Sequence, residues 1–151
     1  MSSVTVKVLC AFIISTISLS AFAEIVASCG ASKGHAYYVS KGLVQPKDSG
    51  WTEDAISEGS FQLIRSGEDW DVIYTDASGG TLSARADGGV TSGFVTDDGD
   101  VVLQIIYGKS VEVYVFWLSL KAPMVSYSQA KFGSPVPKHG VLVAPCRKVA
   151  K

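Results

Sequence analysis

The chain has 151 residues, of which 47% are hydrophobic, and its 13 basic and 14 acidic residues give a net charge of −1. This length suits one domain with its own hydrophobic core. Charges of both signs are scattered along the chain, so we expect neither nucleic acid nor a charged membrane surface as a partner.

Residues 1–23 have the pattern of a secretory signal peptide. Lys7 supplies a positive charge, residues 8–19 form an apolar stretch without charge, and Ala21-Phe22-Ala23 gives the small-x-small cleavage pattern. A membrane anchor is the alternative, but the apolar stretch is short and the cleavage pattern is well formed. We therefore predict an exported protein that begins at Glu24 and has no membrane contact after cleavage.

Two cysteines remain once Cys10 is removed with the predicted signal peptide. Cys29 and Cys146 lie near the two ends of the remaining chain, and such a pair in an oxidising compartment predicts a disulfide. Lipidation of Cys29 is the alternative, because residues 26–29 resemble a lipoprotein cleavage box. The charge of Glu24 argues against it, and lipidation would leave Cys146 as a free thiol.

Residues 24–60 are predicted to be the least regular part of the domain. A short strand is available at residues 35–39, and residues 40–50 are rich in loop-forming glycine, proline, serine and aspartate. Residues 51–58 are predicted to form one or two helical turns, with acidic residues placed early in the segment.

Short β-rich runs separated by turn sequences follow from residue 61 onward. Gly79-Gly80 and Asp87-Gly88 are typical hairpin turns. The spacing of about ten residues between runs predicts some eight strands in up-and-down order, in an antiparallel barrel or sandwich. No helical stretch is long enough for a parallel crossover, so residues 24–151 are expected to form a single all-β domain.

The most apolar run, at residues 101–120, is predicted to be a central hairpin with its turn at Gly108-Lys109-Ser110. In the second arm, residues 111, 113, 115 and 117 alternate with residues 112, 114, 116 and 118. Both sets become apolar toward the end of the arm, which predicts a strand buried on both faces there.

The alternating runs also predict which side chains form the core. The predicted core residues are Phe61, Leu63, Trp70, Val72, Tyr74, Leu82, Phe94, Leu103, Ile105, Val113, Val115, Trp117 and Val141.

Residues 30–34 match the G-x-S-x-G pattern, which in hydrolases places a nucleophilic serine on a turn between a strand and a helix. Ser32 would be that nucleophile, and His35 lies three residues later. No strand was expected before this segment and no long helix after it, so we interpret it as a flexible turn beside the disulfide.

Metal ligands are scarce in the sequence. His35 and His139 are the only histidines, and cysteines in a disulfide are unable to complete a site with them. Asp97-Asp98-Gly99-Asp100 resembles part of a calcium loop but lacks the required ligand spacing, and a hairpin turn explains it. We therefore expect no metal and no cofactor.

Three aromatic residues fall in the segment predicted to be irregular. Tyr37, Tyr38 and Trp51 lie in this segment and are available to line a pocket mouth or a partner surface. With His35 and His139 they form the predicted ligand or partner surface.

The segment Ser28-Cys29-Gly30-Ala31-Ser32-Lys33-Gly34-His35-Ala36-Tyr37-Tyr38, followed by Gly/Asp-punctuated β-runs and a cysteine near the end, resembles small exported bacterial proteins of unknown function. The resemblance implies a secreted or periplasmic bacterial protein and brings no activity with it.

The expected function is a non-catalytic binding module for a protein or a small molecule. The alternative is a small secreted hydrolase that uses Ser32 or His35. The sequence offers no second carboxylate–histidine or cysteine–histidine pattern, which favours the binding module.

Overall fold

The computed structural model describes residues 23–75 and 79–149, and in these ranges the chain forms eleven strands and one turn of 3-10 helix at Pro46–Asp48. The strands are β1 Glu24–Cys29, β2 Ser32–Tyr38, β3 Gly50–Ile56, β4 Ser60–Ser66, β5 Asp69–Thr75, β6 Thr81–Ser83, β7 Val90–Val95, β8 Val101–Ile106, β9 Ser110–Trp117, β10 Met124–Lys131 and β11 Lys138–Lys148. Apart from Ala23, the predicted signal peptide lies outside the described residues, and so does Cys10. None of the described residues belongs to a helix long and apolar enough to cross a membrane.

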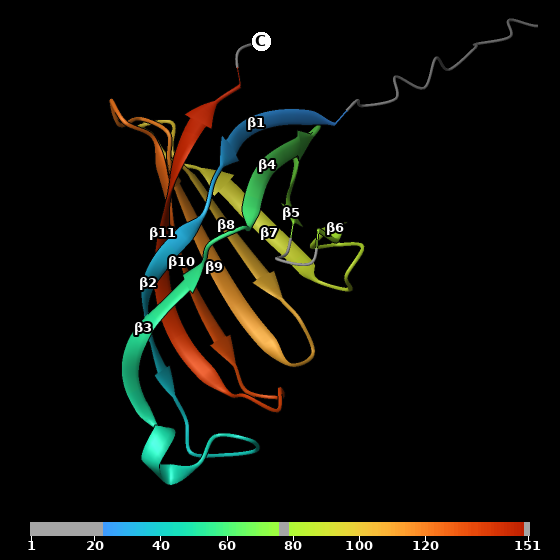
Figure 1. Cartoon of the computed structure of the whole chain (residues 1–151). Helices are drawn as coiled ribbons and strands as arrows, with labels where there is room; N and C mark the ends of the chain where they lie inside the picture. Colours follow the sequence, from blue (N-terminus) through green and yellow to red (C-terminus); the bar gives the residue numbers. More distant parts are fainter. Residues whose placement is uncertain (1–22, 76–78, 150–151) are drawn as a thin grey trace, which may run out of the picture.

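The strands pair antiparallel in one sheet that curls into a half-barrel (Figure 1). Nine of them follow the order β6-β5-β4-β1-β11-β10-β9-β8-β7, while β2 pairs with β11 and β3 pairs with β2. This arrangement confirms the predicted antiparallel all-β fold. The described strands outnumber the expected eight because the N-terminal part, predicted to be irregular, contributes three of them.

Strand β11 organises the sheet because it has two partners on one of its edges. Its first edge pairs with β10 along residues 138–145. The second edge pairs with β2 along residues 138–143 and then with β1 along residues 146–148. The partner changes beside Pro145, which has no N–H to donate, and the Pro145 carbonyl accepts a hydrogen bond of 3.0 Å from the Gly30 N–H.

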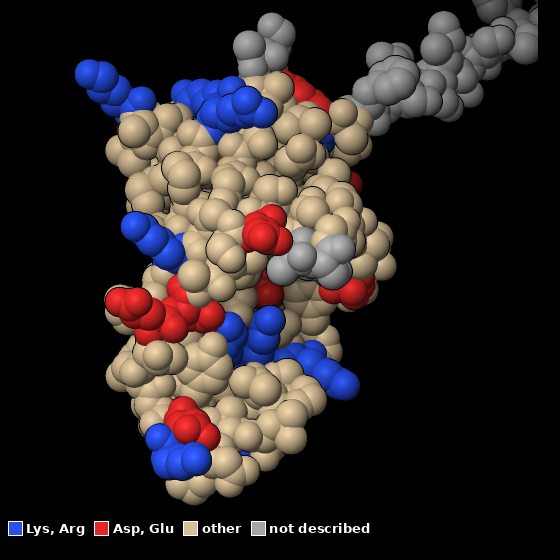
Figure 2. Space-filling model, viewed as in Figure 1, with Lys and Arg blue, Asp and Glu red and all other residues tan. Residues whose placement is uncertain are grey.

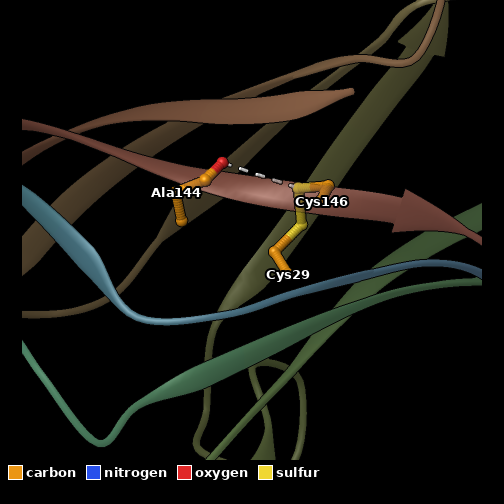
Figure 3. Close-up of a disulfide and its surroundings, with 3 residues drawn as sticks. All are labelled: Cys29, Ala144 and Cys146. Atoms are coloured by element: carbon orange, nitrogen blue, oxygen red, sulfur yellow. Dashed lines mark hydrogen bonds between the residues drawn. A yellow bond between two sulfur atoms is a disulfide. The ribbon is translucent and has the colours of Figure 1, made fainter. Parts of the chain in front are cut away.

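The predicted disulfide joins Cys29 to Cys146 at this change of partner (Figure 3). The two residues are direct cross-strand neighbours in β1 and β11, with their Cα atoms 4.0 Å apart. Strand β11 continues beyond Cys146 to Lys148, because β1 supplies its backbone partners there.

The prediction for residues 24–60 is wrong in detail. The helical turns expected at residues 51–58 are absent, and strand β3 occupies most of that segment. β3 pairs with β2 over its whole length, from Gly50 opposite Tyr38 to Ile56 opposite Ser32. In this antiparallel pairing alternate residues of β3 exchange backbone hydrogen bonds with β2, whereas a helix of one or two turns is unstable without docking.

The hydrophobic core lies between the concave side of β8–β11 and the strands β1, β4 and β5, which curl over one end of it (Figure 1). The buried core residues are Ala27, Cys29, Phe61, Leu63, Trp70, Val72, Ala84, Val101, Leu103, Ile105, Tyr114, Phe116, Leu118, Val125, Tyr127, Leu142 and Ala144. Six of the predicted core residues belong to this set, namely Phe61, Leu63, Trp70, Val72, Leu103 and Ile105. Tyr74 packs against it while partly exposed.

The other predicted core residues face the convex side or solvent. Trp117, Leu82, Phe94 and Val141 are exposed, and Val113 and Val115 are only partly buried. The predicted hairpin is confirmed as β8 and β9, but the inward side of β9 carries Tyr114 and Phe116. Both sides of β9 are apolar, so alternation alone did not show which side packs inside.

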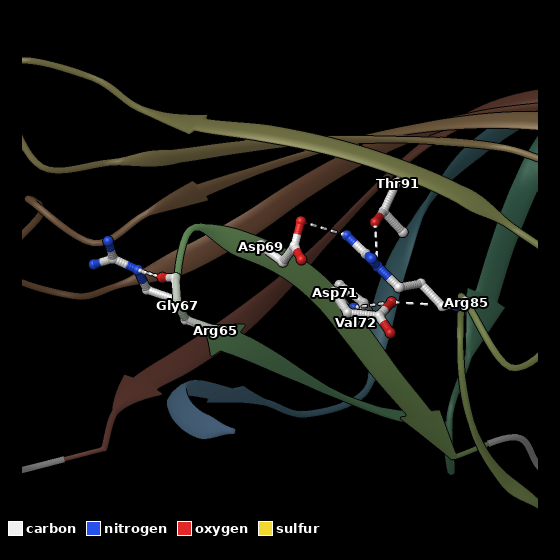
Figure 4. Close-up of polar contacts among 7 residues, drawn as sticks. All are labelled: Arg65, Gly67, Asp69, Asp71, Val72, Arg85 and Thr91. Atoms are coloured by element: carbon white, nitrogen blue, oxygen red, sulfur yellow. Dashed lines mark hydrogen bonds and ion pairs between the residues drawn. The ribbon is translucent and has the colours of Figure 1, made fainter. Parts of the chain in front are cut away.

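The seam between β5 and β7 is held by Arg85 (Figure 4). Its guanidinium group donates to Asp69 on β5 at 3.1 Å and to Thr91 on β7 at 2.7 Å. In addition, the buried Asp71 carboxylate accepts the Val72 N–H at 2.8 Å. The two contacts of Arg85 join β5 and β7, which are not neighbours in the sheet order.

Replacing both cysteines, Cys29→Ala with Cys146→Ala, should lower the free energy of unfolding by about 2–5 kcal/mol, the usual cost of losing a native bridge in a small domain. Urea unfolding of the oxidised wild type and of the double variant gives the difference. The reduced wild type should match the double variant, and the double variant should not respond to reductant. A wild-type curve that is indifferent to reductant would contradict the bond.

Candidate functional site

A cleft of about 380 Å³ opens on the concave side of the half-barrel. The residues that line it are Ile56, Phe61, Tyr74, Thr75, Asp87, Tyr107, Ser110, Glu112, Tyr114, Tyr127, Gln129 and Lys131. They come from β3, β4, β5, β9 and β10 and from the turns after β6 and β8. Four of the six tyrosines of the chain therefore meet at one place.

Aromatic rings from two layers of the fold form the inner wall of the cleft. Tyr114 and Tyr127, on neighbouring strands β9 and β10, stack with their ring centroids 5.1 Å apart. Phe61 from β4 packs edge-on against Tyr127 at 5.2 Å and against Tyr114 at 6.1 Å. The rings are fixed because each packs against two others.

The polar groups of the cleft are bonded to one another. The Tyr114 hydroxyl donates to Glu112 at 2.6 Å, and the Tyr74 hydroxyl donates to Asp87 at 2.6 Å. Deeper in the fold, the Ser32 and Tyr127 hydroxyls share a buried hydrogen bond of 3.1 Å. These bonds set the orientation of the phenol groups before any ligand arrives.

Burial and nearby carboxylates keep these phenols protonated. Burial is the main cause that raises the pKa of Tyr74, Tyr107 and Tyr114, and the charges of Glu112 and Asp87 raise the pKa values of Tyr74 and Tyr107 further. Burial also raises the pKa of Tyr127 to about 12, although the hydrogen bond with Ser32 acts in the opposite direction. At neutral pH the phenols therefore act as hydrogen-bond donors and not as bases or nucleophiles.

A second polar group lies on the same side of the sheet, at the start of β11. Lys138 forms an ion pair with Asp54 of β3, and both side chains are mostly buried. The Lys138 ammonium group also lies 5.5 Å from the centroid of the Tyr38 ring. The positive charge of Lys138 is thus already balanced within the chain.

The structure brings four of the five residues of the predicted surface together, on the convex side. Tyr37 pairs with Trp51 across β2 and β3 and with His139 across β2 and β11. The Tyr37 and Trp51 rings pack edge to face at 5.7 Å. Trp51 is 70% exposed, and His35 lies two positions from Tyr37 on the same exposed side. Tyr38 alone points to the concave side.

Ser32 and His35 are not placed as a nucleophile and its base. Ser32 is the first residue of β2, where it is buried and bonded to Tyr127, and His35 lies three positions later on the opposite, exposed side of the strand. The segment is therefore strand and not the flexible turn that the sequence suggested. Gly34 is required because a Cβ there would collide with the Val141 carbonyl oxygen.

The aspartates that resemble part of a calcium loop lie in the turn between β7 and β8. The Thr96 N–H donates to the Asp100 carbonyl at 2.9 Å, and the buried Asp100 carboxylate accepts the Ser119 N–H at 2.7 Å. Gly99 has a φ of 85°, which suits glycine in such a turn. Within residues 23–75 and 79–149 no group of three or more His, Cys, Asp or Glu residues is placed to hold a metal ion.

The residues of the cleft were not predicted as a site from the sequence. Tyr74 was assigned to the core, and Tyr107, Asp87 and Gln129 were not singled out. The position of Glu112 could have pointed to the cleft. It is the only charged residue of the otherwise apolar β9, and it lies on the same side of the strand as Tyr114. Of the aromatic residues that were predicted to form a surface, Tyr37 and Trp51 lie on the convex side.

Comparison with protein-family models, with curated proteins and with solved structures finds no match.

Ser32→Ala should lower the free energy of unfolding by about 1–3 kcal/mol, because it leaves the buried Tyr127 hydroxyl without a partner. The double change Ser32→Ala with Tyr127→Phe should recover part of that loss, since both polar groups are then gone. Urea unfolding measures both effects. Labelling with a fluorophosphonate should be the same in wild type and Ser32→Ala, and loss of specific labelling in Ser32→Ala would support the hydrolase hypothesis instead.

The raised pKa of Tyr127 predicts how stability depends on pH. An unfolded tyrosine ionises near pH ~10, whereas folded Tyr127 ionises at about 12, so the folded state holds its proton over this interval. This contribution to stability is complete below pH ~10 and is lost as the pH rises toward 12. Thermal unfolding across this range should show a steeper fall in Tm for wild type than for Tyr127→Phe, and equal slopes would contradict the assignment.

Proposed function

We propose that this chain is a non-catalytic, exported binding module that takes a small molecule in its concave cleft. The observation that carries the proposal is the cleft itself, in which aromatic rings and oriented polar groups from five strands surround about 380 Å³. Small-molecule sites of about 300–1,000 Å³ commonly combine an apolar, aromatic lining with a few fixed polar groups.

The rigidity of the lining favours binding. The lining side chains lie mostly on strands, and the phenols are fixed by the bonds from Tyr74 to Asp87 and from Tyr114 to Glu112. A site whose groups are oriented before binding loses less conformational entropy when a ligand enters.

The placement of the two candidate catalytic residues, Ser32 and His35, supports a role without chemistry. The phenols of the cleft hold their protons at neutral pH, and Ser32 and His35 lie on opposite sides of β2. Acyl transfer needs a nucleophile and a base within hydrogen-bond reach, and these two residues do not meet that condition.

Export is supported by the covalent structure. The Cys29–Cys146 bond suits the periplasm or the exterior of a cell, where disulfides persist. Together with the signal-peptide pattern at residues 1–23 it favours a secreted or periplasmic protein, and the resemblance to exported proteins favours a bacterial one. The positive and negative side chains are interspersed along the face shown in Figure 2, which gives no single-sign patch for nucleic acid there.

A second candidate function is the docking of a protein partner on the convex side. Trp51 is 70% exposed there, and Val141 of β11 is 55% exposed. Exposed aromatic and aliphatic side chains on one face are typical of interaction surfaces.

Filling the cleft should abolish small-molecule binding. Ser110→Phe places a ring in the cleft, whereas Ser128→Phe adds the same ring on the exposed convex side of β10. In a thermal-shift screen of neutral sugars, uncharged aromatic compounds and organic amines, at least one class should raise the Tm of wild type and of Ser128→Phe but not that of Ser110→Phe.

Circular dichroism should first show that both variants are folded. If no class raises the Tm of wild type, or if the compounds that do so act equally on Ser110→Phe, the proposal is wrong.

A further inference from the structure

Two hydrogen-bond donors of the cleft are committed to carboxylates of the chain itself. Tyr114 gives its proton to Glu112 and Tyr74 gives its proton to Asp87. Each carboxylate has about four lone-pair positions and uses one of them in these bonds. The acceptor positions that remain on these two carboxylates favour a ligand that brings donors or positive charge.

The charged residues that line the cleft are two carboxylates, Asp87 and Glu112, and one ammonium group, Lys131. The nearby Lys138 is paired with Asp54 and adds no free positive charge. The negative charges of Glu112 and Asp87 act inside the cleft, where both raise the pKa of Tyr107. A cation would gain energy where an anion would lose it.

Aromatic rings add a second attraction for a cation. Phe61, Tyr74, Tyr107, Tyr114 and Tyr127 all line the cleft. The negative face of an aromatic ring attracts a cation within about 6 Å, and groups of such rings recognise alkylammonium groups. Alkylammonium groups that carry several alkyl substituents, quaternary ones above all, are poorly hydrated, so they lose little solvation on entering a partly buried site.

The size of the cleft argues for an organic ion over a bare metal ion. About 380 Å³ exceeds the space that one metal ion fills, and no set of three or more His, Cys, Asp or Glu residues meets here among the described residues. We propose that the cleft binds a small organic cation with an alkylammonium head, held by Glu112 and Asp87 and enclosed by tyrosine rings. This inference rests on the proposed binding function and adds the chemical class of the ligand.

The test compares ligands that have the same shape but different charge. Choline and tetramethylammonium are the cationic probes, and the uncharged carbon isostere of choline, in which a carbon atom replaces the nitrogen, is the matched control. Glucose tests a neutral, hydroxyl-rich ligand. Calorimetric titration of the full chain should show binding of choline at least about tenfold tighter than that of its isostere, which corresponds to one charge-assisted contact in a partly buried site.

Two variants that each remove one negative charge distinguish a specific contact in the cleft from the effect of the overall charge of the protein. Glu112→Gln keeps the size of the side chain and an oxygen that accepts the Tyr114 proton, and it should weaken choline binding by about tenfold. Glu53→Gln makes the same change on the exposed side of β3 and should alter binding by less than about twofold. If Glu112→Gln does not fold, Asp87→Asn in the exposed turn after β6 takes its place.

Each outcome decides the matter. Equal binding of choline and its isostere, or no binding of either cation, would overturn the choice of a cation. Binding of glucose or of the isostere alone would do the same but would leave the proposed binding function intact. Equal weakening by Glu112→Gln and Glu53→Gln would place the cation outside the cleft and would also overturn the inference.

Discussion

The fold depends on one arrangement, in which β11 shares a single edge between two partners. β1 and β2 are consecutive strands that both run along β11, and only Gly30 and Ala31 separate them. β1 continues into the sheet with β4, whereas β2 continues into the sheet with β3. The sheet therefore has to divide at this point, and the Cys29–Cys146 bond holds together the two strands on the side that carries the core.

The division of the sheet produces the cleft. β4 and β5 curl back over one end of the concave side and are held to β7 through Arg85, so that end becomes a closed core (Figures 1 and 4). Phe61 of β4 contributes to both regions, because it belongs to the core and its ring packs on Tyr127 in the wall of the cleft. The stability of the core and the shape of the cleft are thus coupled through this ring.

The parts of the fold that could be predicted from sequence are those fixed by local patterns. The β8–β9 hairpin follows from its turn residues, and the disulfide follows from the count of cysteines. The strand β3 was missed because its residues, such as Asp54 and Glu53, have low β-propensity and are held in place by pairing with β2. Likewise, Trp117 was assigned to the core because the sequence of a strand that is apolar on both sides does not show which side faces the core.

The cleft was beyond prediction for a different reason, since its residues are far apart in sequence. Tyr74, Glu112 and Gln129 meet only because three strands lie on the same concave side. No spacing rule connects them, and each is individually explained as a strand residue. In contrast, Tyr37 and Trp51 attracted notice because they lie in the segment that was expected to be irregular, and they became neighbours through the unexpected β2–β3 pairing.

The polar groups of the cleft also explain how it persists without a ligand. A carboxylate that is partly removed from water costs free energy unless it is hydrogen-bonded, and a neutral phenol is a partner that brings no charge of its own. Glu112 has such a partner in Tyr114, two residues away on the same side of β9. The Tyr114 phenol donates a hydrogen bond to the Glu112 carboxylate and so reduces the cost of its burial, but the phenol is neutral and does not balance the negative charge. The charge therefore remains available to an incoming group, which a salt bridge at the same place would not allow, as the pairing of Lys138 with Asp54 illustrates nearby.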